Sequence, residues 1–389
     1  MNRTMTSRML RLALTAAAAA LVAGCSMIPI PPSMAFWSTV EKPKPAELQP
    51  NPNLLGVRPS WTGRIGTVDF PLVPAVSGNA VAVASSDGTV AAFDASTGRE
   101  QWRGSANAQL AAGVGFDGST AAVVTRNNEV VTFVSGREAW RQKLNVASYT
   151  APLVAGARVF VLGADRSVTA FDGGTGRRLW GQQRTGEPLT LRQSGVILAV
   201  GDTLVVGQGG RLAGLNPLNG TVRWEAPIAS ARGINDIERL VDLVGRVSRV
   251  GDSVCARAFQ SAVGCVDAAR GQLLWTQRAN GAEGVHGDAA NVFGTETDSK
   301  VVSWKRADGS RAWTSERLLH RGLGTPLALG RAVVVGDSFG FVHMLDREDG
   351  TLLNRVATDG SAIAAAPVAA GNHLVVVTRN GGVFAFVPQ

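Results

Sequence analysis

The sequence predicts an all-β protein, an eight-bladed β-propeller whose blades are four-stranded antiparallel sheets. A pattern of strands, tight turns and a tryptophan recurs roughly every 40 residues, the interval typical of one propeller blade. The chain contains 46 glycines among 389 residues, as a protein with many tight turns requires. The incomplete copies at the two ends of the repeat complement each other, which predicts a closed ring.

One copy of the repeat shows the elements of a blade. Ala80 to Ala84 reads as a strand, and Asp87-Gly88 as a two-residue turn in which glycine supplies the positive φ. A second strand ends at Asp94, Thr97-Gly98 forms the next turn, and an outer strand carries Trp102. The outer-strand position recurs at Trp61, Trp102, Trp140, Trp180, Trp224, Trp275 and Trp313, and finally as Asn354. A tryptophan repeated once per blade indicates packing between blades.

The first and last copies predict how the ring closes. The strand around Trp61 has no inner hairpin before it, and the last hairpin, Val375 to Phe386, has no outer strand after it. We therefore expect an N-terminal strand around Trp61 to complete the last blade, since closure removes exposed sheet edges. The propeller is expected over residues 56–389.

The N-terminus reads as a targeting signal. Three arginines within residues 1–11 precede a short apolar run, and small residues lead directly to Cys25. This arrangement resembles the lipobox of bacterial lipoproteins, which implies removal of residues 1–24 and lipidation of Cys25. Ser26 after the cysteine implies sorting to the outer membrane, with the protein facing the periplasm. Residues 25–55, rich in proline, are expected to form an extended tether.

The net charge of +8 does not indicate a nucleic-acid-binding protein. Part of this charge lies in the expected signal peptide, and the remainder is spread over many strands and turns without a concentrated basic run. A solvated surface explains that remainder, so no nucleic-acid partner is expected.

Catalytic and metal-binding motifs are lacking in the sequence. The four histidines fall in different repeats without metal-ligand spacing, and no nucleophile elbow or phosphate-binding loop occurs. Aspartates such as Asp94 recur with the blade at a turn, where a carboxylate binds backbone N–H groups. We therefore expect no catalytic residues, no metal and no cofactor.

Cys255 and Cys265 lie on the two strands of one expected hairpin. A two-residue loop at Gln260-Ser261 would place Cys255 opposite Val266, so that Cys265 points to the other side of the sheet. A β-bulge would change the parity and allow a disulfide. The sequence leaves both possibilities open.

Two successive linkers between blades are candidates for partner binding. Residues 187–194 and 234–243 are longer than the other linkers and should be neighbours, because they serve adjacent blades. They place Leu189 and Leu191 beside Arg192 and Asp242, an apolar patch with charges at its rim, as in protein-binding hot spots. Alternatively, the two leucines begin a buried strand.

The repeated pattern resembles the pyrroloquinoline-quinone-type propeller repeat. The lipobox, the eight copies and the segments 189–192 (Leu-Thr-Leu-Arg), 237–240 (Ile-Glu-Arg-Leu) and 318–321 (Leu-Leu-His-Arg) resemble the BamB family, the propeller lipoproteins of the outer-membrane β-barrel assembly machinery. The resemblance implies a scaffold that binds the periplasmic POTRA domains of BamA through Leu189, Leu191, Arg192 and Asp242. It also implies contact with other subunits of the Bam complex and with unfolded outer-membrane proteins. Val244 departs from the family, which often has a second acid there.

Two other functions use the same fold. A quinoprotein dehydrogenase would need adjacent cysteines, a calcium site and a catalytic aspartate over the propeller centre, and the sequence has no adjacent cysteine pair. A propeller that binds glycan or peptidoglycan would be retained on cell-wall material independently of BamA. Because a fold does not dictate a function, the choice depends on the linkers.

Overall fold

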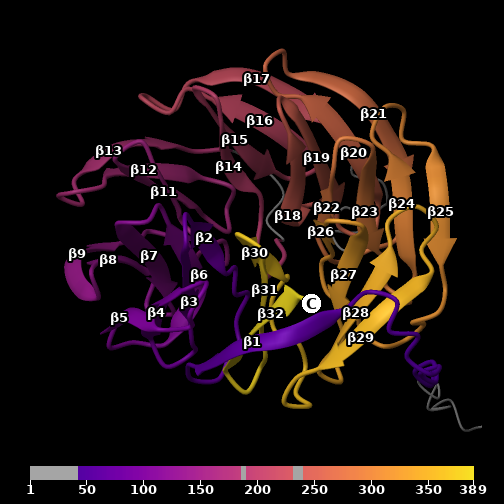
Figure 1. Ribbon diagram of the computed structural model, residues 1–389. Helices are drawn as coiled ribbons and strands as arrows, with labels where there is room; N and C mark the ends of the chain where they lie inside the picture. The colour runs from indigo at the N-terminus through magenta and orange to yellow at the C-terminus, as the bar shows by residue number, and fades with distance from the viewer. Residues whose placement is uncertain (1–42, 185–189, 231–239) are drawn as a thin grey trace, which may run out of the picture. The chain divides into compact units, whose positions relative to one another are not determined.

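A computed structural model describes residues 43–184, 190–230 and 240–389. The chain divides into two compact units, residues 1–44 and 45–389, and the description below concerns the second unit. Its described residues form 32 strands, grouped in eight four-stranded antiparallel sheets around a ring, as Figure 1 shows. The predicted eight-bladed propeller is therefore confirmed. No helix in the described ranges is long and apolar enough to cross a membrane.

Each blade runs from an innermost to an outer strand. Blade 1 contains β2 (Ala75–Ser77), β3 (Ala80–Ala84), β4 (Thr89–Asp94) and β5 (Glu100–Ser105). Blade 2 contains β6 (Leu110–Phe116), β7 (Thr120–Thr125), β8 (Glu129–Val134) and β9 (Arg137–Lys143). Blade 3 contains β10 (Leu153–Ala155), β11 (Arg158–Leu162), β12 (Val168–Asp172) and β13 (Arg178–Gln182). Blade 4 contains β14 (Ile197–Val200), β15 (Thr203–Gln208), β16 (Arg211–Leu215) and β17 (Val222–Pro227).

The second half of the ring repeats this order. Blade 5 contains β18 (Leu243–Val250), β19 (Ser253–Ala258), β20 (Ala262–Asp267) and β21 (Gln272–Arg278). Blade 6 contains β22 (Val285–Gly287), β23 (Asn291–Thr295), β24 (Val301–Lys305) and β25 (Arg311–Ser315). Blade 7 contains β26 (Leu327–Leu329), β27 (Ala332–Gly336), β28 (Phe341–Asp346) and β29 (Leu352–Ala357). Blade 8 contains β30 (Val368–Ala370), β31 (His373–Val377), β32 (Gly382–Pro388) and β1 (Val57–Arg64).

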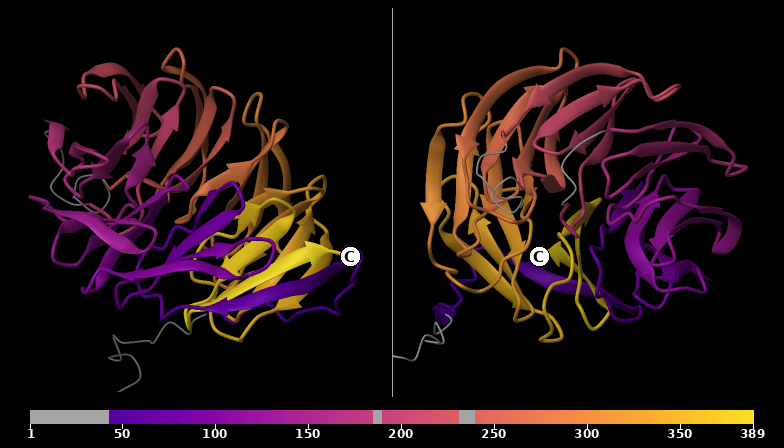
Figure 2. Two further views of the ribbon diagram at one scale, coloured as in Figure 1. Left: turned by 60° about the vertical axis from the view of Figure 1, so that its left-hand side comes forward. Right: turned by 180° about the vertical axis from the view of Figure 1, so that it is seen from behind.

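Blade 8 closes the ring as the sequence predicts. β1 is its outer strand and pairs antiparallel with β32, so that Trp61 lies opposite Ala385. In Figures 1 and 2 the indigo N-terminal strand lies beside the yellow C-terminal strand. Both ends of the repeat therefore share one sheet.

Burial explains the residue types of the strands. The middle strands are packed on both faces by neighbouring blades, so β3 and β4 are almost continuous runs of buried alanine and valine. The outer strands contact a neighbour with one face only. β5 accordingly alternates between exposed and half-buried residues around Trp102.

The tryptophans join each blade to the next. The indole of Trp61 donates a 2.7 Å hydrogen bond to the Ala95 carbonyl, and its ring covers Gly98, where a Cβ would lie 2.6 Å from the ring. Four further tryptophan indoles donate to the equivalent carbonyl of the next blade: Trp140 to Gly173, Trp180 to Pro217, Trp275 to Arg306 and Trp313 to Arg347. The predicted packing of tryptophan between blades is present, and it explains the glycine in most of the outer turns.

The turns within blades differ from the expected two-residue loops. In blade 1 the Ser85 N–H donates to Thr89 O and the Gly88 N–H donates to Ser85 O, which leaves three residues, 86–88, in the loop. Gly88 adopts φ +101°, a conformation that favours glycine. The expected Asp87-Gly88 two-residue turn is therefore wrong, because the loop is a tight turn followed by a glycine bulge.

The N-terminal segment covers the blade that lacks a tryptophan. Asn354 stands at that position in β29, and its side chain donates to Leu55 O and accepts from Asn51. Further along, the Ala46 N–H donates to Leu319 O. Residues 45–55, which the sequence assigns to the tether, thus lie along blade 7 as part of the folded unit. The outer turn against which a tryptophan would pack does not exist in blade 8, because its outer strand comes from the other end of the chain.

Candidate functional site

The segments that join successive blades all lie at one end of the ring, which we call the linker face. Antiparallel strand order brings each outer strand to this face before the next blade begins, together with the turns between the second and third strands. The two candidate linkers, between blades 3 and 4 and between blades 4 and 5, therefore emerge side by side. Leu189 and residues 231–239 lie outside the described residues.

Asp242 joins the two candidate linkers. Its Oδ1 accepts hydrogen bonds of 3.0 and 2.9 Å from Nε and Nη2 of Arg166, and its Oδ2 accepts the Leu191 N–H at 3.2 Å. The Arg166 and Asp242 side chains are only 12% and 14% exposed. Partial burial strengthens such a charge-assisted pair, so Asp242 fixes the shape of this surface instead of projecting from it.

Arg192 is the exposed cation of the same surface. Its guanidinium lies 5.3 Å from the ring centroid of Tyr149, the only tyrosine in the sequence. Leu191 is half-buried, and a depression of about 40 Å³ lies between the two linkers. The depression is lined by Tyr149, Arg166, Thr190, Leu191, Asp242 and neighbouring residues. Tyr149, Leu191, Arg192 and Asp242, with Arg166 behind them, are called the Arg192 surface below.

The structure brings together three of the four predicted partner-binding residues, Leu191, Arg192 and Asp242. It also adds two residues that the sequence did not indicate. Arg166 lies 76 residues before its partner Asp242, so no local motif connects them. Tyr149 lies in the preceding linker on the same face, and its ring is the platform under Arg192.

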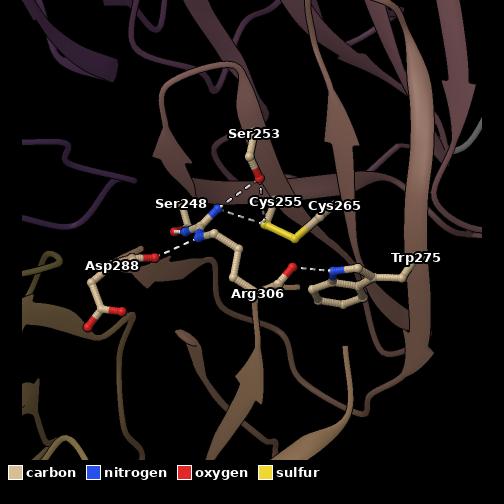
Figure 3. The surroundings of a disulfide bond; sticks show 7 residues. All are labelled: Ser248, Ser253, Cys255, Cys265, Trp275, Asp288 and Arg306. Atoms are coloured by element: carbon tan, nitrogen blue, oxygen red, sulfur yellow. Dashed lines mark hydrogen bonds between the residues drawn. A yellow bond between two sulfur atoms is a disulfide. The ribbon is translucent and has the colours of Figure 1, made fainter. Parts of the chain in front are cut away.

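The cysteines of blade 5 form a disulfide. Cys255 lies directly opposite Cys265 in the β19–β20 pair, and the two sulfur atoms are bonded (Figure 3). The expected register, with Cys255 opposite Val266, is wrong because the loop contains three residues, Phe259 to Ser261. One extra loop residue changes the parity of every pair in the hairpin. A bridge closing a loop of this length contributes about 2–3 kcal/mol to stability.

Arg306 of blade 6 reaches the disulfide from the neighbouring sheet (Figure 3). Its guanidinium donates to Asp288 O at 2.6 Å, to Ser253 Oγ and Cys255 Sγ at 3.1 Å each, and to Ser248 Oγ. Burial lowers the pKa of Arg306. Blades 5 and 6 are thus joined near the ring interior by polar contacts as well as by the Trp275 hydrogen bond.

The segment 318–321 contributes Arg321 to a buried polar cluster in blade 7. Arg321 Nε donates to Asp337 Oδ2 at 2.8 Å, and His343 Nε2 lies 3.0 Å from the same oxygen. All three side chains are buried, and desolvation lowers the pKa of His343. The cluster contains residue types that are common in catalytic sites. Its burial indicates a structural role.

The described residues do not fit a calcium-dependent quinone cofactor. They contain no group of three histidine, cysteine, aspartate or glutamate side chains that could hold a metal. Cys255 and Cys265 face each other across a hairpin and are not adjacent in sequence.

The fold and the repeated joints define a class, the propellers built from pyrroloquinoline-quinone-type repeats. Residues 72–315 and 317–387 match the family model of outer membrane protein assembly factor BamB. The chain therefore belongs to the BamB family.

Curated relatives agree with this assignment, and solved structures show the same fold. The outer membrane protein assembly factor BamB of Burkholderia pseudomallei strain K96243 is 39% identical over 340 residues, which cover 86% of this chain and 89% of that protein. The BamB of Bordetella pertussis strain Tohama I is 36% identical and covers 92% of both chains. The crystal structure of BamB from Moraxella catarrhalis aligns with a TM-score of 0.77 at 24% identity, over 85% of this chain and 99% of that one. A quinohemoprotein alcohol dehydrogenase from Comamonas testosteroni has a TM-score of 0.67 at 14% identity, over 86% of this chain and 77% of that one, which shows the shared fold alone.

Proposed function

We propose that this protein is a non-catalytic scaffold subunit of the machinery that assembles outer-membrane proteins. Membership of the BamB family supports the role in outer-membrane protein assembly and the association with the outer membrane. In this proposal Cys25 carries the lipid anchor, the propeller faces the periplasm, and the Arg192 surface binds the POTRA domains of BamA within the Bam complex.

The observation that carries the docking proposal is the contact of Asp242 with both Arg166 and Leu191. It makes two separate linkers into one preorganised surface, so little conformational entropy is lost on binding. Arg192 and Tyr149 present a cation and an aromatic ring at the centre of this surface, and both residue types are enriched in binding hot spots. The depression beside them can receive a small apolar side chain of the partner.

A charge reversal at Arg192 tests the proposal. In affinity capture of the tagged protein from solubilised outer membranes, we expect Arg192→Glu to reduce the recovered BamA at least about tenfold, since the hot-spot cation becomes an anion. Arg331→Glu is the matched control. Arg331 is also exposed, with no side-chain partner in the described part of the chain, and lies in the β26–β27 turn at the opposite end of the ring.

Two results would reject the Arg192 surface as the docking site. One is wild-type recovery of BamA with Arg192→Glu. The other is an equal loss with both variants, which would indicate a general effect of charge. Thermal unfolding of each variant checks that the propeller remains folded.

A further inference from the structure

A cavity of about 660 Å³ lies at the linker-face end of the central channel and adjoins the depression of the Arg192 surface, with which it shares Gln193 and Val244. Linkers and innermost strands from around the ring line it, and its apolar wall contains Phe70, Leu72, Ile197, Val247 and Val368. The volume falls within the range of about 300–1,000 Å³ typical of ligand sites. An apolar wall of this kind needs a polar group to orient a ligand, and Arg246 supplies one.

A bulge in β18 aims Arg246 into the cavity. β18 pairs with β19 through Val244 opposite Arg257 and next through Ser248 opposite Cys255. Three residues, 245–247, thus face a single residue of β19, and Gly245 takes φ +63°. A bulge redirects side chains that a regular strand would place elsewhere.

The neighbouring blade holds this bulge in place. A Cβ on Gly284 would lie 2.4 Å from both the backbone nitrogen and the backbone oxygen of Arg246. The Gly284 N–H donates to Thr325 Oγ1 at 3.1 Å, which fixes the glycine itself. The direction of Arg246 is therefore built into the backbone packing between blades 5 and 6.

Arg246 is a partly buried cation with no counter-ion among the described residues. Its guanidinium donates one hydrogen bond, to Pro367 O of blade 8 at 2.7 Å, and no carboxylate of the described residues pairs with it. Desolvation lowers its pKa to about 10, so the group remains charged at neutral pH. A buried charge without a partner is costly. The remaining N–H groups are free to bind an anion in the cavity.

No nearby carboxylate of the described residues forms an ion pair with Arg246. His286 accepts the Ala328 N–H through Nδ1, and burial together with the charge of Arg246 lowers its pKa to about 3, so it is uncharged. Glu283 accepts a hydrogen bond from Thr325, and burial raises its pKa. The two exposed charges at the cavity, Asp69 and Arg379, are opposite in sign. Because burial favours the neutral form of Glu283, one negative charge, as on a carboxylate, suits Arg246 better than a multiply charged phosphate group.

We propose that this cavity binds the C-terminus of a peptide with apolar last residues, the terminal carboxylate on Arg246 and the side chains against the apolar wall. A peptide is favoured because β18, β22 and β30 are sheet edges whose backbone groups face the channel and can bind a backbone. This inference does not depend on the docking of BamA.

The test compares two forms of one probe on the purified full chain. Isothermal titration calorimetry measures acetyl-Ala-Val-Phe with a free carboxylate and the same peptide with a C-terminal amide. We expect the free acid to bind about tenfold to a hundredfold more tightly, the usual effect of charge-assisted hydrogen bonds. Arg246→Gln removes this preference. Arg249→Gln retains it, because Arg249 lies on the same strand but is exposed and bonded to Gly251 and Ala199 carbonyls.

Three outcomes would overturn the proposal: equal binding of acid and amide, no binding of the acid, or a preference for the acid that survives in Arg246→Gln. Decanoate serves as a carboxylate without a peptide backbone. Binding of decanoate through Arg246 without binding of the peptide would overturn the peptide assignment. If Arg246→Gln fails to fold, the acid and amide on the wild-type chain and on Arg246→Lys decide the question. Capture of BamA by Arg246→Gln is measured separately and should be unchanged.

Discussion

The outer rim of the ring repeats one contact from blade to blade, whereas the region around the innermost strand of blade 5 does not. At the rim, Trp61, Trp140, Trp180, Trp275 and Trp313 make the same hydrogen bond to the next blade. Around blade 5, by contrast, a three-residue bulge in β18 lies near the disulfide between β19 and β20 and the guanidinium of Arg306 from blade 6, and of these features only the bulge has a counterpart, in β6 of blade 2. The contacts that recur from blade to blade hold the ring together. The residues that depart from the repeat line the candidate binding surfaces.

The largest effect at neutral pH is expected at the glycine that holds the bulge. Gly284→Ala places a methyl group against the backbone of Arg246 and should lower the free energy of unfolding by about 2–3 kcal/mol. Gly324→Ala, in the next linker of the same face, enters open space and should change stability by less than about 0.5 kcal/mol. Urea unfolding measures both variants. Equal effects would show that the bulge is not held by close packing.

The pH dependence of the free energy of unfolding tests the charge of His286, in the interior beside the bulge. Because the pKa of His286 is about 3 in the folded protein, against about 6.5 when unfolded, the unfolded state binds more protons between these values. Stability is complete above pH 6.5 and falls as the pH drops, by up to about 1.4 kcal/mol per pH unit for this group. His286→Asn retains an acceptor for the Ala328 N–H without titrating.

The measurement is the difference between the two proteins in free energy of unfolding at pH 7, 6, 5 and 4. Wild type should lose more stability than His286→Asn below pH 6.5. Other groups, including His343, give both proteins a common slope. Parallel curves over this range would contradict the assignment of an uncharged, buried His286.

The smallest effect is expected at the rim, where two joints differ. Trp313 donates to Arg347 O at 2.9 Å, whereas the buried Nε1 of Trp224 has no partner in the described part of the chain. Trp313→Phe loses a hydrogen bond and should cost about 1 kcal/mol more than Trp224→Phe, which removes an unpaired donor. Thermal unfolding compares the two. A larger cost for Trp224→Phe would show that its indole has a partner or a packing role of its own.

The repeat allowed the blade number and the closure by β1 to be predicted, because both depend on residues that recur at fixed spacing. The register of β19 and β20 was not predicted, since a two-residue and a three-residue loop differ by one residue that carries no strong signal. That single residue decided whether Cys255 and Cys265 meet.

The interior of blade 5 was not predicted for another reason. The residues 245–247 read as part of an ordinary strand, and the bulge becomes visible only through the pairing with β19. A signal was available in the sequence: Gly245 interrupts the strand pattern, and an isolated glycine inside a strand is typical of a bulge. The bond between Arg166 and Asp242 likewise depends on the fold that brings distant linkers together.

The pairing of β1 with β32 sets the order in which the molecule can be completed. β1 is synthesised before all the other strands described and β32 after them, so β1 has no partner in its sheet until β32 has been made. A chain truncated before Gly382 would leave β1 and β31 with open edges, a hazard for association with other chains. Closure of the ring therefore requires that synthesis has passed β32.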